Sequence, residues 1–406
     1  MTVKLYMHFL LIGLCLTPLP APHAYEIGYT SDTFTDSARA RRIPVQIYYP
    51  AETDGQNVPV AEPDSTGFPV ISFGHGYQMH WSVYANIWTG VVPAGYIIVL
   101  PRTAGELFPD HQEFALDLAY VIRALQRQGA DSASIFNEKI AQTSAVMGHS
   151  MGGGASVLTA ASDSGITALV NLAAAETNPS AIQAAEAVDI PALLFAGSHD
   201  CVTPPEIHQI PIYSALASDC KTRITLTGGS HCQFAEYNLI CSLGELGCSS
   251  PDITRTQQHA LIDQFLLPWL AAKLKNDGEA WYTFEHRLEN EPGITCEHTC
   301  RTVSAIPEAP QTDSPSLFRC RNYPNPFNSQ ATIEYALPRE GTVTLTVFNS
   351  RGQRMWQQDL GTQTMGLHHL HWPGMDTHGQ RLASGCYIYQ LCWNGRIQNG
   401  KLILLE

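Results

Sequence analysis

Three side chains that together can carry out acyl transfer occur in this chain in the order serine, aspartate, histidine. Residues 148–152 read Gly-His-Ser-Met-Gly, a pattern that places Ser150 at a sharp turn with its hydroxyl exposed. Asp200 and His231 each follow a later apolar run. An imidazole can accept the serine proton, and a carboxylate can fix the tautomer of that imidazole. We therefore predict that Ser150, Asp200 and His231 act as nucleophile, acid and base.

Acyl transfer also needs hydrogen-bond donors for the oxyanion that forms in the transition state. The backbone N–H of Met151 comes with the serine turn, and a second N–H is expected from Tyr77, in the loop after the apolar run 70–73. The side chains of Tyr77, Met151 and Trp81 are expected to bind substrate. His199 is a rival base, but its position directly before the candidate acid should turn its ring elsewhere.

The elements that must position these residues alternate between strands and helices. Continuous apolar runs are typical of strands covered on both faces, and residues 114–125 repeat apolar side chains at helical spacing. This alternation predicts an α/β fold with a mostly parallel central sheet. The expected strands are 25–29, 43–49, 68–73, 96–100, 145–147, 168–172, 192–196 and 223–226, and the expected helices are 84–92, 114–125, 153–161, 181–187 and 256–274.

Composition limits the kinds of partner. The chain has 406 residues, of which 44% are hydrophobic, and a net charge of −14, which indicates a globular protein of two domains and argues against nucleic acid or an anionic membrane as partner. His368, His369 and His371 alternate between the faces of a predicted strand, so we expect a solvated strand and no metal site. We also expect a monomer that needs no cofactor.

The chain divides into four segments by composition. Residues 1–24 carry Lys4, an apolar run and a Pro-Ala-Pro-His-Ala ending, the order of a secretory signal peptide. The catalytic α/β domain is expected at 25–275, followed by a connecting segment at 276–320. Short β-rich runs separated by turn residues then predict a small all-β sandwich at 321–406. The mature protein is expected to have no membrane span.

Ten of the eleven cysteines lie from Cys201 onward, and export makes disulfides their expected use. Cys201 and Cys232 directly follow the candidate acid and base, so they form one expected pair, with Cys220 as the alternative partner of Cys201. The remaining expected bonds join Cys241 to Cys248, and Cys320 to either Cys386 or Cys392.

The segment between residues 172 and 192 has room for a single helix. Lids that close over active sites need longer insertions, so an open site is expected, which favours bulky or polymeric substrates. The segment 238–252 is an alternative source of partial cover.

Four motifs resemble the polyesterase and cutinase group of α/β-hydrolases (PET hydrolase-like), with its chlorophyllase-like and dienelactone-hydrolase-like relatives. They are Gly-His-Gly-Tyr (74–77), Gly-His-Ser-Met-Gly-Gly-Gly (148–154), Cys-Val-Thr-Pro-Pro (201–205) and Gly-Gly-Ser-His (228–231). The resemblance covers residues 40–275 and implies an α/β-hydrolase fold and a carboxylic-ester hydrolase. Bacterial polyester hydrolases carry a tryptophan where residues 174–179 read Ala-Ala-Glu-Thr-Asn-Pro, so cleavage of aromatic polyesters stays open.

The C-terminal segment resembles the type A sorting domain of type IX secretion and the flagellar hook-capping Ig-like domain. The motifs that carry this resemblance are Tyr-Pro-Asn-Pro-Phe-Asn (323–328), Trp-Pro-Gly-Met-Asp-Thr-His-Gly (372–379), Ala-Ser-Gly-Cys-Tyr (383–387) and Gly-Lys-Leu (400–402). It implies export through an outer-membrane secretion machinery, and release from the cell or attachment to its surface.

Two other hypotheses fit the same residues. In one, the triad acts on a phospholipid acyl ester or an amide; in the other, the chain is a catalytically silent surface binding or adhesion protein that keeps the fold. Loss of ester turnover in Ser150→Ala would exclude the silent protein.

Overall fold

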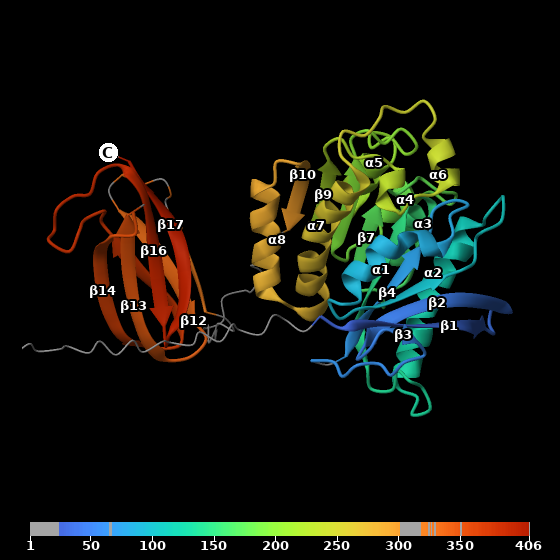
Figure 1. Cartoon of the computed structure of the whole chain (residues 1–406), viewed down its shortest axis with the longest axis horizontal. Helices are drawn as coiled ribbons and strands as arrows, with labels where there is room; N and C mark the ends of the chain where they lie inside the picture. Colours follow the sequence, from blue (N-terminus) through green and yellow to red (C-terminus); the bar gives the residue numbers. More distant parts are fainter. Residues whose placement is uncertain are drawn as a thin grey trace, which may run out of the picture. The chain divides into compact units, whose positions relative to one another are not determined.

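The computed structural model describes residues 24–64, 67–300, 318–323, 325, 327–328, 330–349 and 351–405. The chain divides into two compact units, residues 1–303 and 304–406 (Figure 1), which are described separately. The expected signal peptide lies outside the described residues except for its last residue. Within the described residues, no helix is long and apolar enough to cross a membrane.

The first unit is built on a ten-stranded mixed sheet with the strand order β10-β9-β8-β7-β6-β4-β5-β2-β1-β3. The six strands from β9 to β5 in this order run parallel to one another, whereas β2, β1 and β10 each pair antiparallel with a neighbour. The strands are β1 (Glu26–Asp36), β2 (Arg41–Ala51), β3 (Gly55–Gln56), β4 (Phe68–Gly74), β5 (Ile97–Pro101), β6 (Ile140–His149), β7 (Ala168–Leu172), β8 (Ala192–Gly197), β9 (Cys220–Leu226) and β10 (Ile294–Cys300).

Helices cover both faces of this sheet, which explains the continuous apolar runs of its central strands. Residues of α2, α3, α4 and α5 share one hydrophobic core with one face, and residues of α1, α7 and α8 share a second core with the other face. The helices are α1 (Ala85–Val91), α2 (His111–Gly129), α3 (Met151–Ser162), α4 (Ala181–Ala185), α5 (Gln209–Ala215), α6 (Leu239–Gly244), α7 (Arg255–Lys275) and α8 (Gly278–Asn290), with 3₁₀ turns η1 (Trp81–Tyr84) and η2 (Cys232–Phe234).

The first unit continues beyond the boundary that the sequence indicated at residue 275. Helix α8 packs against α7, and β10 pairs with β9 through the register Ile294↔Leu226 to Cys300↔Cys220. The expected connecting segment 276–320 therefore begins with a helix and a strand. Residues 295–299 of β10 are exposed at the sheet edge, which explains why no apolar run marked this strand.

The second unit contains a three-stranded sheet, β11-β12-β15, and a four-stranded sheet, β14-β13-β16-β17. The apolar faces of both sheets meet in one core, in which Trp372, Tyr389 and Trp393 are buried, so the all-β prediction for the described part of this unit is confirmed. The strands are β11 (Arg319–Tyr323), β12 (Ala331–Leu337), β13 (Gly341–Asn349), β14 (Arg354–Gln363), β15 (Gly366–Trp372), β16 (Gly385–Trp393) and β17 (Arg396–Leu404).

Disulfide bonds form, but every expected pairing is wrong. The bonds join Cys201 to Cys248, Cys220 to Cys300, and Cys232 to Cys241. The pairing of β9 with β10 brings Cys220 opposite Cys300, whereas Cys241 reaches back to Cys232 within one connection. Within the part of the chain that the structure describes, the expected partners in the second unit, Cys320, Cys386 and Cys392, form no disulfide. Three disulfides indicate a protein made for an oxidising compartment.

A buried carboxylate joins the first hairpin to α2. Asp117 has no exposed side-chain area, and its two oxygens accept hydrogen bonds from Arg39 and Arg41 at 2.7–2.9 Å. We predict that Asp117→Asn lowers the free energy of unfolding by about 3 kcal/mol, because two partly buried guanidinium groups lose their fully buried counter-charge and keep only the more exposed Asp36 and Glu113. Urea denaturation measures this change, with Glu113→Gln as the control. Glu113 contacts the same arginines at a more exposed position, so its replacement should have an effect of under about 1 kcal/mol. Equal effects would contradict the account.

Candidate active site

Ser150 lies at a strained turn between β6 and α3. Its backbone φ is 55°, a left-handed value that non-glycine residues rarely adopt. The turn is possible because glycines flank it: a Cβ on Gly148 would lie 2.2 Å from the Gly152 carbonyl oxygen, and a Cβ on Gly152 would lie 2.2 Å from the Gly74 carbonyl oxygen. Strand β4, strand β6 and the start of α3 therefore approach at backbone distance, and Ser150 stands at the carboxyl end of the parallel strands.

Asp200 and His231 form a buried hydrogen-bonded pair. His231 Nδ1 lies 2.8 Å from Asp200 Oδ2, and the two residues are only 2% and 4% exposed. The other carboxylate oxygen accepts the backbone N–H groups of Val202 and Thr203 at 3.0 and 2.8 Å. A carboxylate held in this way fixes the imidazole with Nδ1 protonated, which leaves Nε2 free to accept a proton.

The loops that carry these two residues meet because their strands are parallel neighbours. Asp200 follows β8 and His231 follows β9, and the His199 N–H donates to the Gly229 carbonyl at 2.8 Å. The His149 ring, next to Ser150, lies 4.7 Å from the His231 ring between centroids. The structure thus brings the three predicted residues to one end of the sheet.

A buried hydrogen-bonded chain, which we call the Tyr84–His149 relay, runs through this end of the sheet. The Gly76 N–H donates to the Tyr84 hydroxyl at 2.7 Å, and that hydroxyl lies 3.0 Å from His149 Nδ1. His149 Nε2 lies 3.2 Å from the His231 carbonyl oxygen. Because a carbonyl only accepts, His149 carries its proton on Nε2, and Nδ1 accepts from Tyr84. The relay links the loop after β4, the serine turn and the His231 loop.

The two predicted oxyanion donors lie on segments joined by these contacts. Met151 is the first residue of α3, where backbone N–H groups have no partner within the helix. Tyr77 directly follows Gly76, and its hydroxyl donates to the Leu107 carbonyl at 2.9 Å. The Tyr77 side chain is 44% exposed, whereas Met151 is 4% exposed and packs in the core shared with α2. Only this small exposed part of Met151 is accessible to a substrate, and substrate binding by its side chain stays a prediction.

The ring of Trp81 joins an aromatic cluster. It lies 6.2 Å from both Tyr48 and Trp88 and 4.9 Å from His80 between ring centroids, and Tyr48 stacks on Trp88 at 4.3 Å. None of these neighbours is a predicted catalytic residue, so substrate binding by Trp81 stays a prediction.

The rival base, His199, contacts the Ser250 carbonyl at 2.8 Å and Asp252 at 3.5 Å, away from the candidate acid.

Sequence reasoning missed Thr203, whose hydroxyl touches both partners of the buried pair. Thr203 Oγ1 lies 2.8 Å from Asp200 Oδ2, 3.0 Å from His231 Nδ1 and 3.2 Å from the Ala173 carbonyl oxygen. A threonine three residues after an aspartate in a strand-end loop is a recognisable side-chain-to-backbone turn, so this signal was present in the sequence.

Two further histidines form hydrogen bonds to the segment 174–179, where bacterial polyester hydrolases carry a tryptophan that this chain lacks. His208 Nδ1 accepts the Glu176 N–H at 2.9 Å, and His111 Nδ1 accepts the Asn178 N–H at 3.1 Å. Burial lowers the pKa of His208, which favours the neutral ring, whose unprotonated nitrogen can accept this hydrogen bond.

Helix α4 is the only helix between β7 and β8, so the predicted short connection is confirmed.

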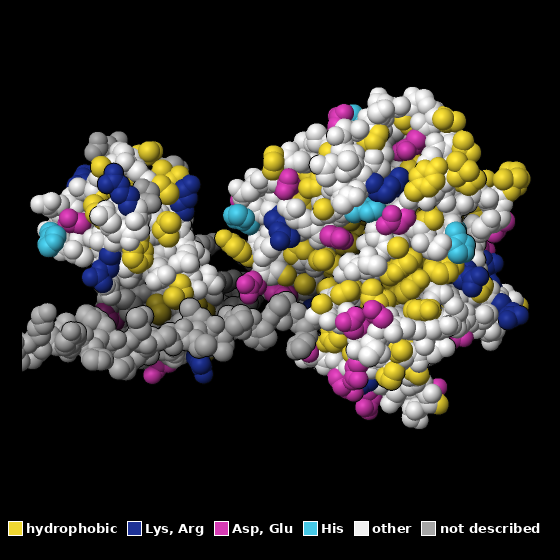
Figure 2. All heavy atoms as spheres, in the orientation of Figure 1, with side chains coloured by type: hydrophobic (Ala, Val, Ile, Leu, Met, Phe, Trp, Pro, Cys, Tyr) yellow, Lys and Arg dark blue, Asp and Glu magenta, His cyan; other side chains and the backbone are white. Residues whose placement is uncertain are grey.

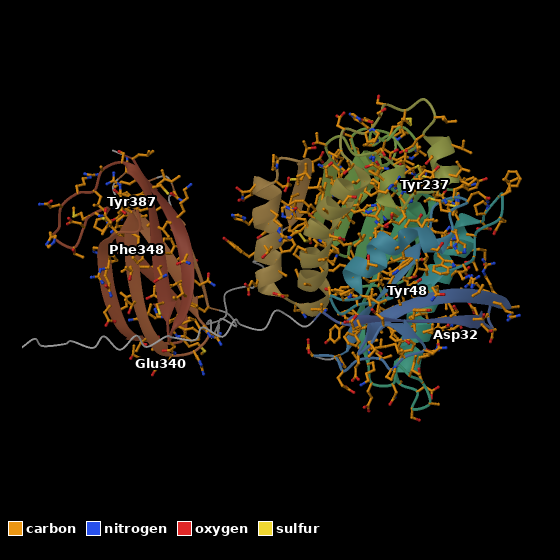
Figure 3. The ribbon with its side chains drawn as sticks, in the orientation of Figure 1. Asp32, Tyr48, Tyr237, Glu340, Phe348 and Tyr387 are labelled. Atoms are coloured by element: carbon orange, nitrogen blue, oxygen red, sulfur yellow. A yellow bond between two sulfur atoms is a disulfide. The ribbon has the colours of Figure 1, made fainter. Side chains whose placement is uncertain are left out.

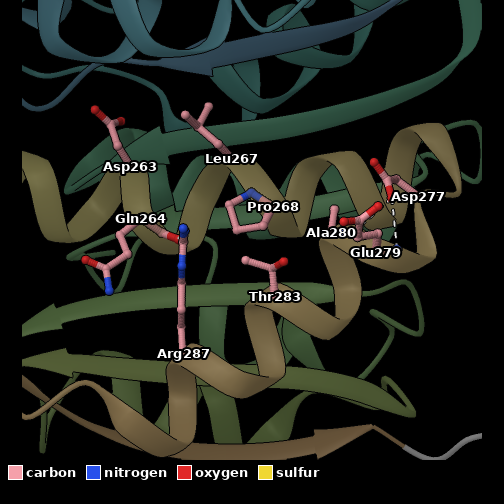
Figure 4. A pocket seen from close by; sticks show the side chains of 9 residues that line it. All are labelled: Asp263, Gln264, Leu267, Pro268, Asp277, Glu279, Ala280, Thr283 and Arg287. Carbon is pink, nitrogen blue, oxygen red and sulfur yellow. Dashed lines mark hydrogen bonds between the residues drawn. The ribbon is translucent and has the colours of Figure 1, made fainter. Parts of the chain in front are cut away.

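A hollow in the first unit lies away from these residues, between α7 and α8 (Figure 4). Its volume is about 530 Å³, and Asp263, Pro268 and Arg287 are among its lining residues. Burial raises the pKa of Asp263 to about 6. None of the lining residues belongs to the candidate triad. Over the described residues, no cluster of His, Cys, Asp and Glu has the arrangement of a metal site.

We predict that Tyr84→Phe lowers the free energy of unfolding by about 2 kcal/mol, because the Gly76 N–H and His149 Nδ1 lose a buried partner. Tyr96→Phe is the matched control. Tyr96 is equally buried, but its hydroxyl has no hydrogen-bond partner among the described residues, so its removal should leave stability unchanged or slightly higher. Thermal and urea unfolding of both variants provide the comparison, and a Tyr84→Phe protein as stable as Tyr96→Phe would refute the relay.

The pH dependence of stability tests His149 itself. Burial lowers the pKa of His149 well below its usual value, and the nearby His231 adds to this effect. The unfolded chain therefore binds a proton near pH 6.5 that the folded chain does not, so the stability contributed by His149 is complete above that pH and declines below it. The stability lost on His149→Gln should shrink between pH 8 and pH 5, by at most about 1.4 kcal/mol per pH unit. If urea titrations gave the same loss of stability for His149→Gln at every pH, that result would contradict a buried, neutral His149 ring.

Comparison with known proteins gives two family matches. A family model described as PET hydrolase-like matches residues 29–249, and a model of the FlgD Ig-like domain matches residues 327–400. The chain is also similar to "Cutinase est2" of Thermobifida alba, with 26% identity over 188 residues. That alignment covers 46% of this chain and 56% of the cutinase, so the chain spans little more than half of that relative's length.

Proposed function

This chain belongs to the PET hydrolase-like family, and we propose that it is a serine esterase of α/β-hydrolase fold that cleaves carboxylic esters through Ser150, His231 and Asp200. Family membership and the similarity to a cutinase support an ester hydrolase. The observation that carries the serine mechanism is the buried 2.8 Å contact between His231 Nδ1 and Asp200, next to a strained serine turn.

In the proposed reaction, Ser150 Oγ attacks the ester carbonyl carbon while His231 Nε2 takes the hydroxyl proton. The tetrahedral oxyanion accepts hydrogen bonds from the backbone N–H groups of Tyr77 and Met151. The protonated imidazole then gives its proton to the leaving alcohol, and an acyl-enzyme remains on Ser150. Water, deprotonated by His231, attacks this ester, the bond between the acyl carbon and Ser150 Oγ breaks to release the acid, and the imidazolium returns its proton to Ser150 Oγ. Asp200 stabilises the imidazolium in both steps.

The proposed substrate is a bulky or polymeric ester that reaches the site from solvent. Support comes from the short connection between β7 and β8, which contains a single five-residue helix. The segment 174–179 lacks the tryptophan expected for polyester hydrolases, which favours aliphatic over aromatic substrates.

The proposed location is outside the cell. The leader-like residues 1–24 and three disulfides support export. The match of residues 327–400 to an Ig-like domain is compatible with a C-terminal sorting domain, and we propose delivery through type IX secretion on the sequence motifs of that domain. Release and attachment to the cell surface are both compatible with this route.

We predict that Ser150→Ala and His231→Ala each lower kcat for p-nitrophenyl esters by at least about 10³-fold, because nucleophile and base act as one unit. His199→Ala, the control, should retain activity within about threefold, since this ring faces Ser250 and Asp252. A fluorophosphonate probe followed by mass spectrometry should modify Ser150 alone. Full ester turnover by folded Ser150→Ala would reject the triad, whereas turnover of only amides or phospholipids by the wild type would move the proposal to those bonds.

A further inference from the structure

Exposed hydrophobic side chains of the first unit concentrate at one end of the sheet. The described residues of this unit include 13 exposed large hydrophobic side chains, and all but Tyr29, Ile135 and Tyr282 lie in the connections that follow β4, β5, β8 and β9. These connections leave the carboxyl ends of parallel strands, where Ser150, Asp200 and His231 also lie. Single exposed hydrophobic residues are ordinary, but ten around one site mark an interaction surface.

The segment 237–246, which contains helix α6, contributes half of these ten residues. None of its residues is buried, and the exposed fractions are 59% for Leu239, 50% for Ile240 and 54% for Leu243, with Tyr237 at 68% before the helix and Leu246 at 76% after it. Figure 2 shows hydrophobic side chains gathered over α6, and Figure 3 labels Tyr237 beside it. A helix of a monomeric globular protein normally turns such residues toward its core.

Covalent bonds hold this helix with its apolar side outward. Leu239 and Leu243 lie four residues apart and share one side of the helix. Cys241, two residues from each, points to the opposite side and is bonded to Cys232, directly after His231. The far end of the segment is bonded through Cys248 to Cys201, directly after Asp200. The apolar side of α6 is therefore fixed in register with the candidate acid and base.

The surface lacks charges that would compete with an apolar partner. Glu245 is the one charged side chain in residues 237–248, and its carboxylate accepts the Cys232 N–H at 2.8 Å. The surrounding connections carry the acidic residues Glu106, Glu206 and Glu236 against one cation, Arg102, on a chain whose net charge is −14. Repulsion between like charges excludes an anionic surface, so the partner is apolar and uncharged.

We propose that residues 237–246, together with Leu107 and Phe108, form an apolar docking surface that inserts into a fluid phase of uncharged aliphatic ester, such as neutral glyceride droplets, and presents that phase to Ser150. This inference rests on the proposed esterase function. The fluid phase is favoured over a solid one because the side chains project from separate connections, and Phe108 is 88% exposed. A liquid can surround each projecting side chain, whereas a rigid solid touches only the outermost ones.

The experiment compares binding with catalysis in full-length protein. Adsorption of Ser150→Ala protein to glyceryl trioctanoate droplets is measured by flotation, with and without the additional changes Leu239→Ser and Leu243→Ser. We expect the added changes to weaken adsorption at least tenfold. In the active protein the same pair of changes should lower droplet hydrolysis at least tenfold and leave kcat/KM for soluble p-nitrophenyl acetate within twofold. Ile135→Ser with Tyr282→Ser, which removes two exposed hydrophobic residues outside these connections, should change neither property.

Three results would overturn the docking surface: unchanged droplet adsorption after Leu239→Ser with Leu243→Ser, an equal loss in the control pair, or tighter adsorption to phosphatidylglycerol vesicles than to droplets. Tighter adsorption to a polycaprolactone film than to droplets would overturn the assignment to a fluid phase. Soluble ester turnover that survives Ser150→Ala would reject the proposed function instead, and the adsorption result would still decide the docking surface on its own.

Discussion

The hydrogen bond between the His231 imidazole and the Asp200 carboxylate is almost completely shielded from solvent, since the two residues are 2% and 4% exposed. A buried carboxylate is stable only when its oxygens are fully hydrogen-bonded, and Asp200 meets this requirement with two backbone N–H groups, the Thr203 hydroxyl and the imidazole. The loops after β8 and β9 must therefore touch. They do so at Gly197, where a Cβ would lie 2.6 Å from the Gly229 carbonyl oxygen. The parallel pairing of β8 with β9 brings these two loops to the same end of the sheet.

Different kinds of bond hold the His231 loop on its inner and outer sides. Inside, the Tyr84–His149 relay connects the His231 carbonyl to the loop after β4 through groups that are fully buried. Hydrogen bonds suffice there because no water competes for the partners. Outside, where the connections are exposed, the bonds Cys232–Cys241 and Cys201–Cys248 restrain the segment. An open site can thus keep a fixed geometry without a covering lid.

Local sequence patterns predicted those parts of the fold that depend on local chemistry. The glycine-flanked serine turn and the apolar runs of β4, β7 and β8 are each specified by neighbouring residues, as is the amphipathic side of α2. Contacts between distant segments were not predictable in this way. Cys220 pairs with Cys300 only because β10 returns to the sheet edge 80 residues later, and its polar sequence gave no strand signal. Helix α6 was missed because its apolar side faces outward, and Tyr84 became informative only when folding placed it against His149.

The central claim is that Ser150, the Asp200–His231 pair and two backbone N–H groups act on one ester. A crystal structure of the protein inactivated by a phosphonate ester tests this most directly, because the adduct resembles the tetrahedral intermediate. The account predicts phosphorus bonded to Ser150 Oγ, with one phosphonyl oxygen about 2.7–3.1 Å from the N–H groups of both Tyr77 and Met151. An adduct on another residue, or a phosphonyl oxygen that points to solvent without these contacts, would contradict it.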